Sequence, residues 1–162
     1  MRILGVDPGT ARIGYGLLEG RANPRLLTYG TIEVVARGTQ GLRELSEKFS
    51  ELLDRHTPAI AGVEKIFFAK NQKTAIPVAE ARGVILIELL RRNIPVIEWR
   101  PAEVKIAVTS YGLADKKAVA KMVRKLLGVS DLGPYDDATD ALAIALATAF
   151  RDPRLDDGKD GV

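Results

Sequence analysis

Apolar and polar positions follow two different periods along the chain. Five short segments, either uniformly apolar or alternating and bounded by turn-forming residues, predict β-strands. They cover residues 2–6, 13–19, 26–35, 59–66 and 94–99. The first three follow one another with short connections, which is typical of an antiparallel meander.

Longer segments carry the 3.6-residue spacing of helices. In the first of them Thr39 is the expected cap and Pro58 follows the end. In the second, Pro77 is expected in the first turn, where a missing N–H costs little. The predicted helices cover residues 39–55, 74–92, 101–109, 115–127 and 136–150.

The order β-β-β-α-β-α-β-α predicts an α/β fold with one mixed sheet flanked by helices. A helical crossover after the third strand makes the fourth strand parallel to the first. A five-stranded sheet of three antiparallel and two parallel strands in this order is also found in ribonuclease H-like domains. We expect a single domain over residues 1–150, followed by a polar, disordered tail over residues 151–162.

The residue inventory restricts the chemistry. The 162 residues are 46% hydrophobic and include no cysteine and one histidine, His56. Disulfides and cysteine nucleophiles are therefore excluded, and a zinc site or a Ser-His-Asp triad is hard to build, which leaves carboxylate chemistry. No apolar run reaches the ~20 residues of a membrane span, and Met1 leads directly into a predicted strand. A cytoplasmic protein with no membrane partner is expected.

Positive charge is concentrated in the middle of the chain. From Lys65 to Lys125 there are 13 Lys or Arg against 5 Asp or Glu, whereas the net charge of the whole chain is only +3. Clustered cations favour a polyanionic partner because their binding releases counterions from phosphates. A solvated helix face is the alternative interpretation of the same charges.

Two acids stand at the ends of predicted strands. Asp7 precedes Pro8 and Gly9 after the first strand, and Glu64 lies at the end of the fourth. Ligands of α/β sheets collect beyond the carboxyl ends of parallel strands, so both side chains are expected at the same edge. Taken alone, Asp7 is also explained as a turn residue and Glu64 as a solvated acid.

Asp137 and Asp140 lie three residues apart at the start of the last predicted helix, hence on one face. Acids in a first turn also complement the helix dipole, and this explanation serves Asp136 equally well. Four carboxylates crowded at one end of a sheet would repel one another without a cation. Oxygen ligands favour Mg²⁺ or Mn²⁺, and two such ions about 4 Å apart can activate water in phosphodiester hydrolysis. The sequence thus predicts a magnesium-dependent nuclease.

Four segments, in the same order and at similar intervals, resemble the RuvC family of Holliday-junction resolvases. They are ILGVDPGTARIGYGLL, VEKIFFAKNQKTA followed by EARGV, PAEVKIAVTSYGLADKKAVAKMV, and DDATDALAIAL, so that the resemblance reaches to about Phe150. It implies a ribonuclease H-like endonuclease that nicks two opposing strands of a four-way DNA junction in recombination and repair. It also implies a homodimer that cooperates with the branch-migration proteins RuvA and RuvB.

The same resemblance implies roles for individual residues. The catalytic and metal-binding acids fall on Asp7, Glu64, Asp137 and Asp140, the third of which is histidine in some relatives. Lys105 and Lys116 match basic residues near the scissile phosphate, where they could stabilise developing charge. Phe67 matches an aromatic wedge that stacks on an unpaired base, a contact worth ~1–3 kcal/mol. Further DNA contacts are expected from Lys70, Asn71, Arg82, Lys117, Lys121, Arg124 and Lys125.

Other interpretations stay open at this point. A core position is the alternative for Phe67 and the preferred interpretation of Phe68. Asp-Pro-Gly-Thr after a first strand also resembles the phosphate-binding turn of actin-like ATPases, but 162 residues leave little room for their second lobe. A ribonuclease H-like nuclease acting on another nucleic acid is the nearer alternative. A non-catalytic junction-binding module would need a broken acidic set, and the sequence has an intact one.

Overall fold

The computed structural model describes residues 1–66, 72–133 and 136–151, and five strands and five helices lie in these ranges. The strands form one sheet in the order β3-β2-β1-β4-β5. Strands β1 (Arg2–Asp7), β2 (Arg12–Glu19) and β3 (Arg25–Glu33) are antiparallel, whereas β4 (Ile60–Glu64) and β5 (Val96–Trp99) run parallel to β1. The predicted five-stranded mixed sheet is confirmed.

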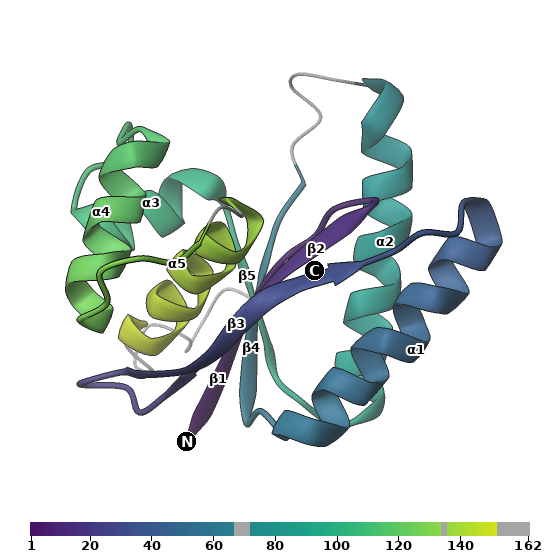
Figure 1. Ribbon diagram of the computed structural model, residues 1–162, viewed down its shortest axis with the longest axis horizontal. Helices are drawn as coiled ribbons and strands as arrows, with labels where there is room; N and C mark the ends of the chain where they lie inside the picture. Colours follow the sequence, from purple (N-terminus) through teal and green to yellow (C-terminus); the bar gives the residue numbers. More distant parts are fainter. Residues whose placement is uncertain (67–71, 134–135, 152–162) are drawn as a thin grey trace, which may run out of the picture.

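Helices cover both faces of this sheet (Figure 1). Helices α1 (Gly38–His56) and α2 (Gln72–Arg91) lie on one face, and α5 (Asp136–Phe150) lies on the other. Helices α3 (Pro101–Thr109) and α4 (Lys116–Leu127) pack against α5. Each face has its own apolar core. In the described ranges, every helix is too short or too polar to cross a membrane.

The start of α1 differs from the prediction. The helix begins at Gly38 after Arg37 as N-cap, so the predicted cap at Thr39 is wrong. A glutamate further along the helix holds the incoming chain instead: Glu44 Oε2 accepts the N–H groups of Val35 (3.1 Å) and Ala36 (2.8 Å). A side chain from the second turn thus accepts the backbone N–H groups at the helix start, which is the role that the sequence pattern assigned to Thr39.

Helix α2 begins at Gln72, two residues earlier than predicted. Pro77 is therefore its sixth residue and lies inside the helix, not in the first turn. The apolar spacing marked the start too late because the first residues of the helix are polar. The other predicted boundaries agree with the structure within two residues.

A row of glycines allows α5 to lie very close to the sheet. Gly16, Gly5 and Gly62 are neighbours in register across β2, β1 and β4. A Cβ atom at Gly5 would lie 2.0 Å from the carbonyl oxygen of Ala141, and one at Gly62 would lie 2.1 Å from Thr148 Oγ1. Both distances are far below van der Waals contact. The glycine row therefore sets the depth at which α5 packs.

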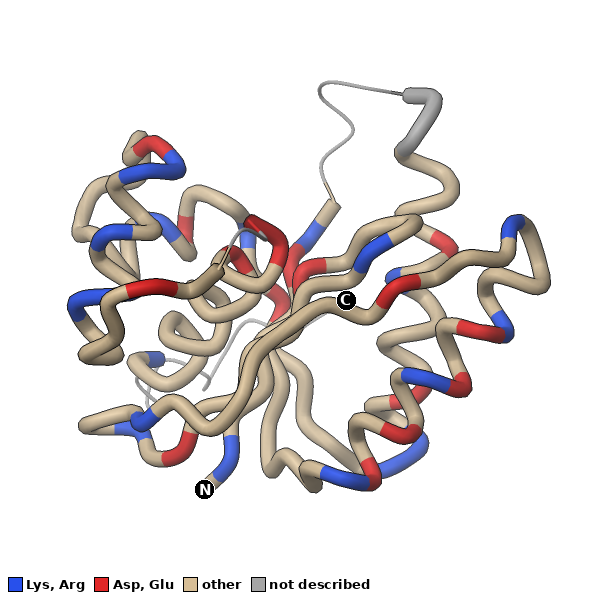
Figure 2. Tube along the Cα trace, in the orientation of Figure 1, with Lys and Arg blue, Asp and Glu red and all other residues tan. Residues whose placement is uncertain are grey.

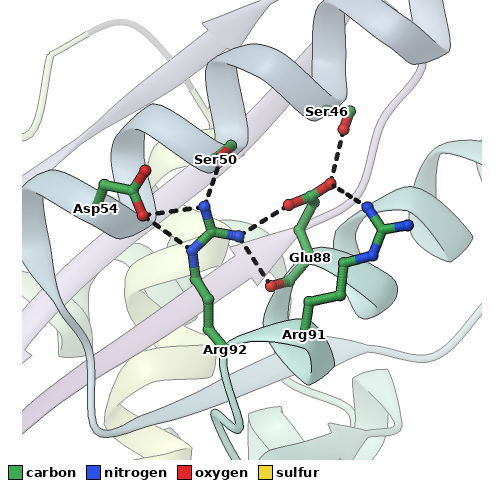
Figure 3. Close-up of polar contacts among 6 residues, drawn as sticks. All are labelled: Ser46, Ser50, Asp54, Glu88, Arg91 and Arg92. Atoms are coloured by element: carbon green, nitrogen blue, oxygen red, sulfur yellow. Dashed lines mark hydrogen bonds and ion pairs between the residues drawn. The ribbon is translucent and has the colours of Figure 1, made fainter.

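On the opposite face, a polar network joins α1 to α2 (Figure 3). Glu88 is buried, and its carboxylate accepts a hydrogen bond from Ser46 Oγ (2.7 Å) and pairs with Arg92 (2.9 Å). The same guanidinium donates to Ser50 Oγ (2.5 Å) and Asp54 Oδ1 (3.0 Å). The buried charge is thus fully engaged, and the network fixes one helix against the other.

The residue that follows α5 is still held against the folded domain. Arg151, the first residue of the predicted tail, donates its N–H to the carbonyl oxygen of Ala147 (3.0 Å). Its guanidinium lies over the Trp99 ring, 5.9 Å from the centroid. The rest of the predicted tail, residues 152–162, lies outside the described residues.

Candidate active site

Four acids gather where β1, β4 and α5 meet, and we call them the acidic cluster. Asp7 is the last residue of β1 and Glu64 the last of β4, while Asp137 and Asp140 lie near the start of α5. Gly14 is the ladder partner of Asp7, and a Cβ atom there would lie 2.0 Å from the carbonyl oxygen of Asp137. Direct contact between α5 and β2 therefore places the helix start beside the end of β1.

The acids of the cluster oppose one another's ionisation. Burial raises the pKa of Asp7 to about 8, with further contributions from the charges of Glu64, Asp140 and Asp137. Burial, followed by the charge of Asp140, raises the pKa of Glu64 to about 7. Burial also raises the pKa of Asp140, although the charge of Lys116 acts against it. A divalent cation would relieve this repulsion.

Lys116 contacts the acidic cluster, and the charge of Lys105 also acts on it. Lys116, at the start of α4, is exposed, and its Nζ lies 3.2 Å from Asp140 Oδ2. Lys105 is half-buried on α3. The charges of both lysines lower the pKa of Glu64, against the larger effects of burial and Asp140. The structure therefore brings both predicted lysines to the acids.

Arg12 is a further cation at the site, and the sequence alone did not single it out. Its Nε lies 3.3 Å from Asp137 Oδ2. As the first residue of β2, it lies near the end of the antiparallel strand β1. The short connection between these two strands was the available signal, because it returns the chain to the strand end that carries Asp7.

Asp136 is a third acid at the start of α5, next to the two that belong to the acidic cluster. It is exposed, and its charge raises the pKa of Asp140 more than that of Asp137 does. The acids that raise the pKa of Asp7, however, are Glu64, Asp140 and Asp137. This coupling places Asp137 in the cluster.

The acidic cluster fits a divalent cation by charge and by donor type, since Mg²⁺ prefers oxygen ligands. In the described part of the chain, no three carboxylates are arranged closely enough to hold one ion. Instead, Asp137 faces Arg12 and Asp140 faces Lys116. A divalent cation bound by these two carboxylates would have to displace the cationic side chains that they face.

Of the predicted DNA contacts, those on α4 are at the surface. Figure 2 shows basic positions along α4 and acidic positions at the start of α5 beside it. The exposed or half-exposed members on α4 are Lys117, Lys121, Arg124 and Lys125. Arg82, on α2, contacts Glu64 and Glu98 within the protein. The remaining predicted contacts, Phe67, Lys70 and Asn71, lie outside the described residues, as does Phe68.

Residues 3–148 match the family model described as crossover junction endodeoxyribonuclease RuvC. The chain belongs to the RuvC family. The RuvC of Syntrophomonas wolfei is 46% identical over 149 residues, covering 90% of this chain and 87% of the relative. The RuvC of Thermotoga maritima is 43% identical over 155 residues, covering 93% and 92%. Nucleases of this family are metal-dependent endodeoxyribonucleases.

Solved RuvC structures are also similar. Thermus thermophilus RuvC in complex with Holliday junction substrate has a TM-score of 0.86 and 31% identity, and the match covers 93% of each chain. The fowlpox virus resolvase bound to its substrate Holliday junction DNA has a TM-score of 0.62 and 18% identity, which shows the fold alone. These matches confirm the predicted ribonuclease H-like fold and the resemblance to RuvC.

Proposed function

We propose that this RuvC-family protein is a structure-selective endonuclease that resolves four-way Holliday junctions by paired, symmetric nicks. The observation that carries this proposal is the acidic cluster, whose members repel one another, with Lys105 and Lys116 beside it. Its T. thermophilus relative has been solved with a Holliday junction substrate. A junction nuclease needs such a site, because phosphodiester hydrolysis requires activated water and neutralised phosphate charge.

Four residues would hold the metal: Asp7, Glu64, Asp137 and Asp140. We infer two Mg²⁺ ions, for which Mn²⁺ substitutes, and these ions supply activation of water and stabilisation of the leaving oxygen when bound. Lys116 and Lys105 contribute fixed positive charge toward the scissile phosphate. Phe67 stacks on an unpaired base. Contacts with the phosphate backbone fall to Lys70, Asn71, Lys117, Lys121 and Arg124.

A homodimer follows from the proposed reaction, because two symmetric nicks require two sites that face a two-fold junction. The exposed face of α2 supports this inference. Apolar or small residues at helical spacing form a stripe along it, namely Ile76, Ala79, Gly83, Ile87 and Leu90. A second copy packed on this stripe would cover it. The dimer would act in the cytoplasm with the branch-migration proteins RuvA and RuvB.

A cleavage assay tests the proposal by comparing a four-way junction, a DNA duplex and an RNA–DNA hybrid in Mg²⁺, Mn²⁺ and Ca²⁺. Paired nicks at symmetric positions of the junction are expected, with the duplex and hybrid left intact. Cleavage of the hybrid would instead favour a nuclease acting on another nucleic acid.

The variant Asp7→Asn tests the role of the acidic cluster in the same assay. Cleavage should fall by at least ~100-fold, since even the outer partners of metal ligands are worth ~10–100-fold. Junction binding in Ca²⁺ should remain. Asp54→Asn, on the opposite face of the sheet, is the matched control. Normal cutting by Asp7→Asn in Mg²⁺ would refute the metal-binding role.

A further inference from the structure

Arg82 of α2 connects the ends of two strands at the active-site edge. Its Nε donates to the carbonyl oxygen of Glu64 at 3.0 Å, and its NH2 group pairs with the carboxylate of Glu98 on β5. Only 18% of the side chain is exposed. Two nitrogens of the guanidinium are thus engaged by the protein itself, although the sequence suggested a contact with DNA.

The contact with Glu64 acts on the strand end that carries a member of the acidic cluster. Glu64 is the last residue of β4, and the next residue, Lys65, donates its N–H to the carbonyl oxygen of Trp99 (2.8 Å). Arg82 binds the carbonyl of the same peptide group, so both sides of this planar unit are held. Together with the pairing of β4 in the sheet, this fixed plane restricts the direction in which the Glu64 side chain leaves the strand.

Glu98 determines where the guanidinium lies. It is the ladder partner of Val63, one residue before the end of β4, so its backbone belongs to the rigid sheet. A carboxylate at this point balances the charge of Arg82 and orients its planar fork of N–H groups. The arrangement therefore runs from Glu98 through Arg82 to the backbone of Glu64.

We propose that Arg82 is a positioning residue for Glu64, with Glu98 as its anchor. The inference rests on the proposed function, because it assigns Arg82 a role at the same site. Arg82 touches none of the reacting atoms. It fixes the strand end from which Glu64 reaches the metal, and a lysine cannot replace it fully because one ammonium lacks the fork that binds both acceptors.

The test uses the full chain with Arg82→Gln, Arg82→Lys and Glu98→Gln, and Arg91→Gln on the exposed part of α2 as control. Three quantities are measured: the Mg²⁺ and Mn²⁺ concentrations that give half of the thermal stabilisation without DNA, junction affinity in Ca²⁺, and single-turnover cleavage. For Arg82→Gln we expect the metal midpoint to rise ~10–100-fold, with cleavage recovering at high Mg²⁺. Junction affinity should not change. Arg82→Lys and Glu98→Gln should show the same shift to a smaller extent.

Two outcomes would overturn the proposal. Weaker junction binding with an unchanged metal midpoint, and a salt dependence reduced by ~1 in slope, would make Arg82 a DNA contact. If all three variants melt at a lower temperature but keep the metal midpoints of the wild type, the role of Arg82 is purely structural. If the wild type binds metal but does not cut four-way junctions, the proposed function fails, whereas the metal midpoints still decide the role of Arg82.

Discussion

The two faces of the sheet are packed by different means. On the α5 face, the glycine row meets the alanine-rich helix at backbone distance. On the α1–α2 face, large side chains such as Phe49, Leu53 and Ile85 fill the space, and the Glu88 network connects the helices. On the α5 face, an added atom could be accommodated only by a shift of the backbone, whereas on the α1–α2 face side chains can adjust. The acids of the site lie on the α5 face.

The two faces also differ in how far their helices are enclosed. Nearly every residue of α5 from Ala138 to Ala149 is buried, because the sheet lies on one side of it and α3 and α4 on the other. Helix α1 buries only one stripe, including Leu45 and Phe49, and its other side is exposed. A buried helix with fixed depth can hold Asp137 and Asp140 at a constant distance from β1. We therefore expect changes on the α5 face to affect catalysis first and changes on the α1–α2 face to affect stability first, except at Arg82, which contacts the strand end that carries Glu64.

The strongest test of this division is Gly14→Ala. The added Cβ would lie 2.0 Å from the carbonyl oxygen of Asp137, a backbone atom that cannot move without moving the start of α5. A displacement of about 1 Å at a reacting group can reduce the rate ~100-fold, so we expect a loss of that size in single-turnover cleavage. Overpacking should also lower the free energy of unfolding by ~1–3 kcal/mol, measured in urea.

Gly30→Ala, on β3, is the matched control for Gly14→Ala. Its Cβ would meet the hydroxyl end of the Tyr15 side chain at 2.9 Å, and a side-chain end can move. Cleavage by this variant should stay close to that of the wild type. If Gly14→Ala also cuts normally, backbone contact is not what places Asp137.

The affinity of the acidic cluster, on the α5 face, for metal should depend on pH. The pKa values of Asp7 and Glu64 are raised to about 8 and about 7, first by burial and then by neighbouring carboxylates. A carboxyl group whose pKa is raised in the folded state stabilises the metal-free fold at pH values below its ordinary pKa. This contribution is lost as pH rises from the ordinary pKa through the raised one. Metal requires the ionised forms, so the Mg²⁺ midpoint for thermal stabilisation should fall by up to ~tenfold per pH unit for each proton released.

Asp7→Asn separates this effect from general electrostatics. The variant removes one titrating group, so the slope of the metal midpoint against pH should become shallower. It should also raise the melting temperature of the metal-free protein above neutral pH, because one repelling charge is gone. A wild-type midpoint that does not vary with pH would contradict the raised pKa values.

The sequence predicted the parts of the site that depend on element order. The strand ends of Asp7 and Glu64 share an edge because a helical crossover makes β4 parallel to β1, and apolar spacing located α5 correctly. Both conclusions need only local patterns and one topological rule. Family resemblance added Lys105 and Lys116, which the structure brings to the acids.

Contacts between elements far apart in sequence were not predictable in the same way. The resemblance suggested Arg82 as a DNA contact, and spacing does not reveal that Glu98 and the Glu64 carbonyl lie within its reach. Arg12 was missed for the same reason. The glycines of β1 and β2 were visible, and glycine inside a strand often marks a close backbone approach. Their alignment across neighbouring strands marks the surface on which α5 packs, but this alignment is known only once the strand pairing is known.

On the α1–α2 face, Glu88→Ala should reduce stability without affecting catalysis. The substitution removes a buried acceptor of Ser46 and Arg92, whose hydrogen bonds keep the pKa of Glu88 below its usual value. Leaving such partners unsatisfied costs ~1–3 kcal/mol in the free energy of unfolding, measured in urea. Glu47→Ala, which breaks an exposed pair on α1, should cost only ~0.2–0.5 kcal/mol. A large loss of cleavage in Glu88→Ala at a temperature where it is folded would break the division between the faces.

The smallest effect is expected for Glu44→Gln at the entry to α1. Hydrogen bonds from Lys48 and from the backbone of Ala36 and Val35 lower the pKa of Glu44 to about 2. A carboxyl group with a lowered pKa contributes stability that is complete above its ordinary pKa of 4.5 and is lost progressively as pH falls from 4.5 to about 2. The wild type should therefore melt slightly above Glu44→Gln at neutral pH, and this advantage should shrink between pH 4.5 and about 2, with cleavage unchanged. An advantage that stays constant over this interval would mean that Glu44 titrates like an ordinary surface acid and that other contacts hold the chain entering α1.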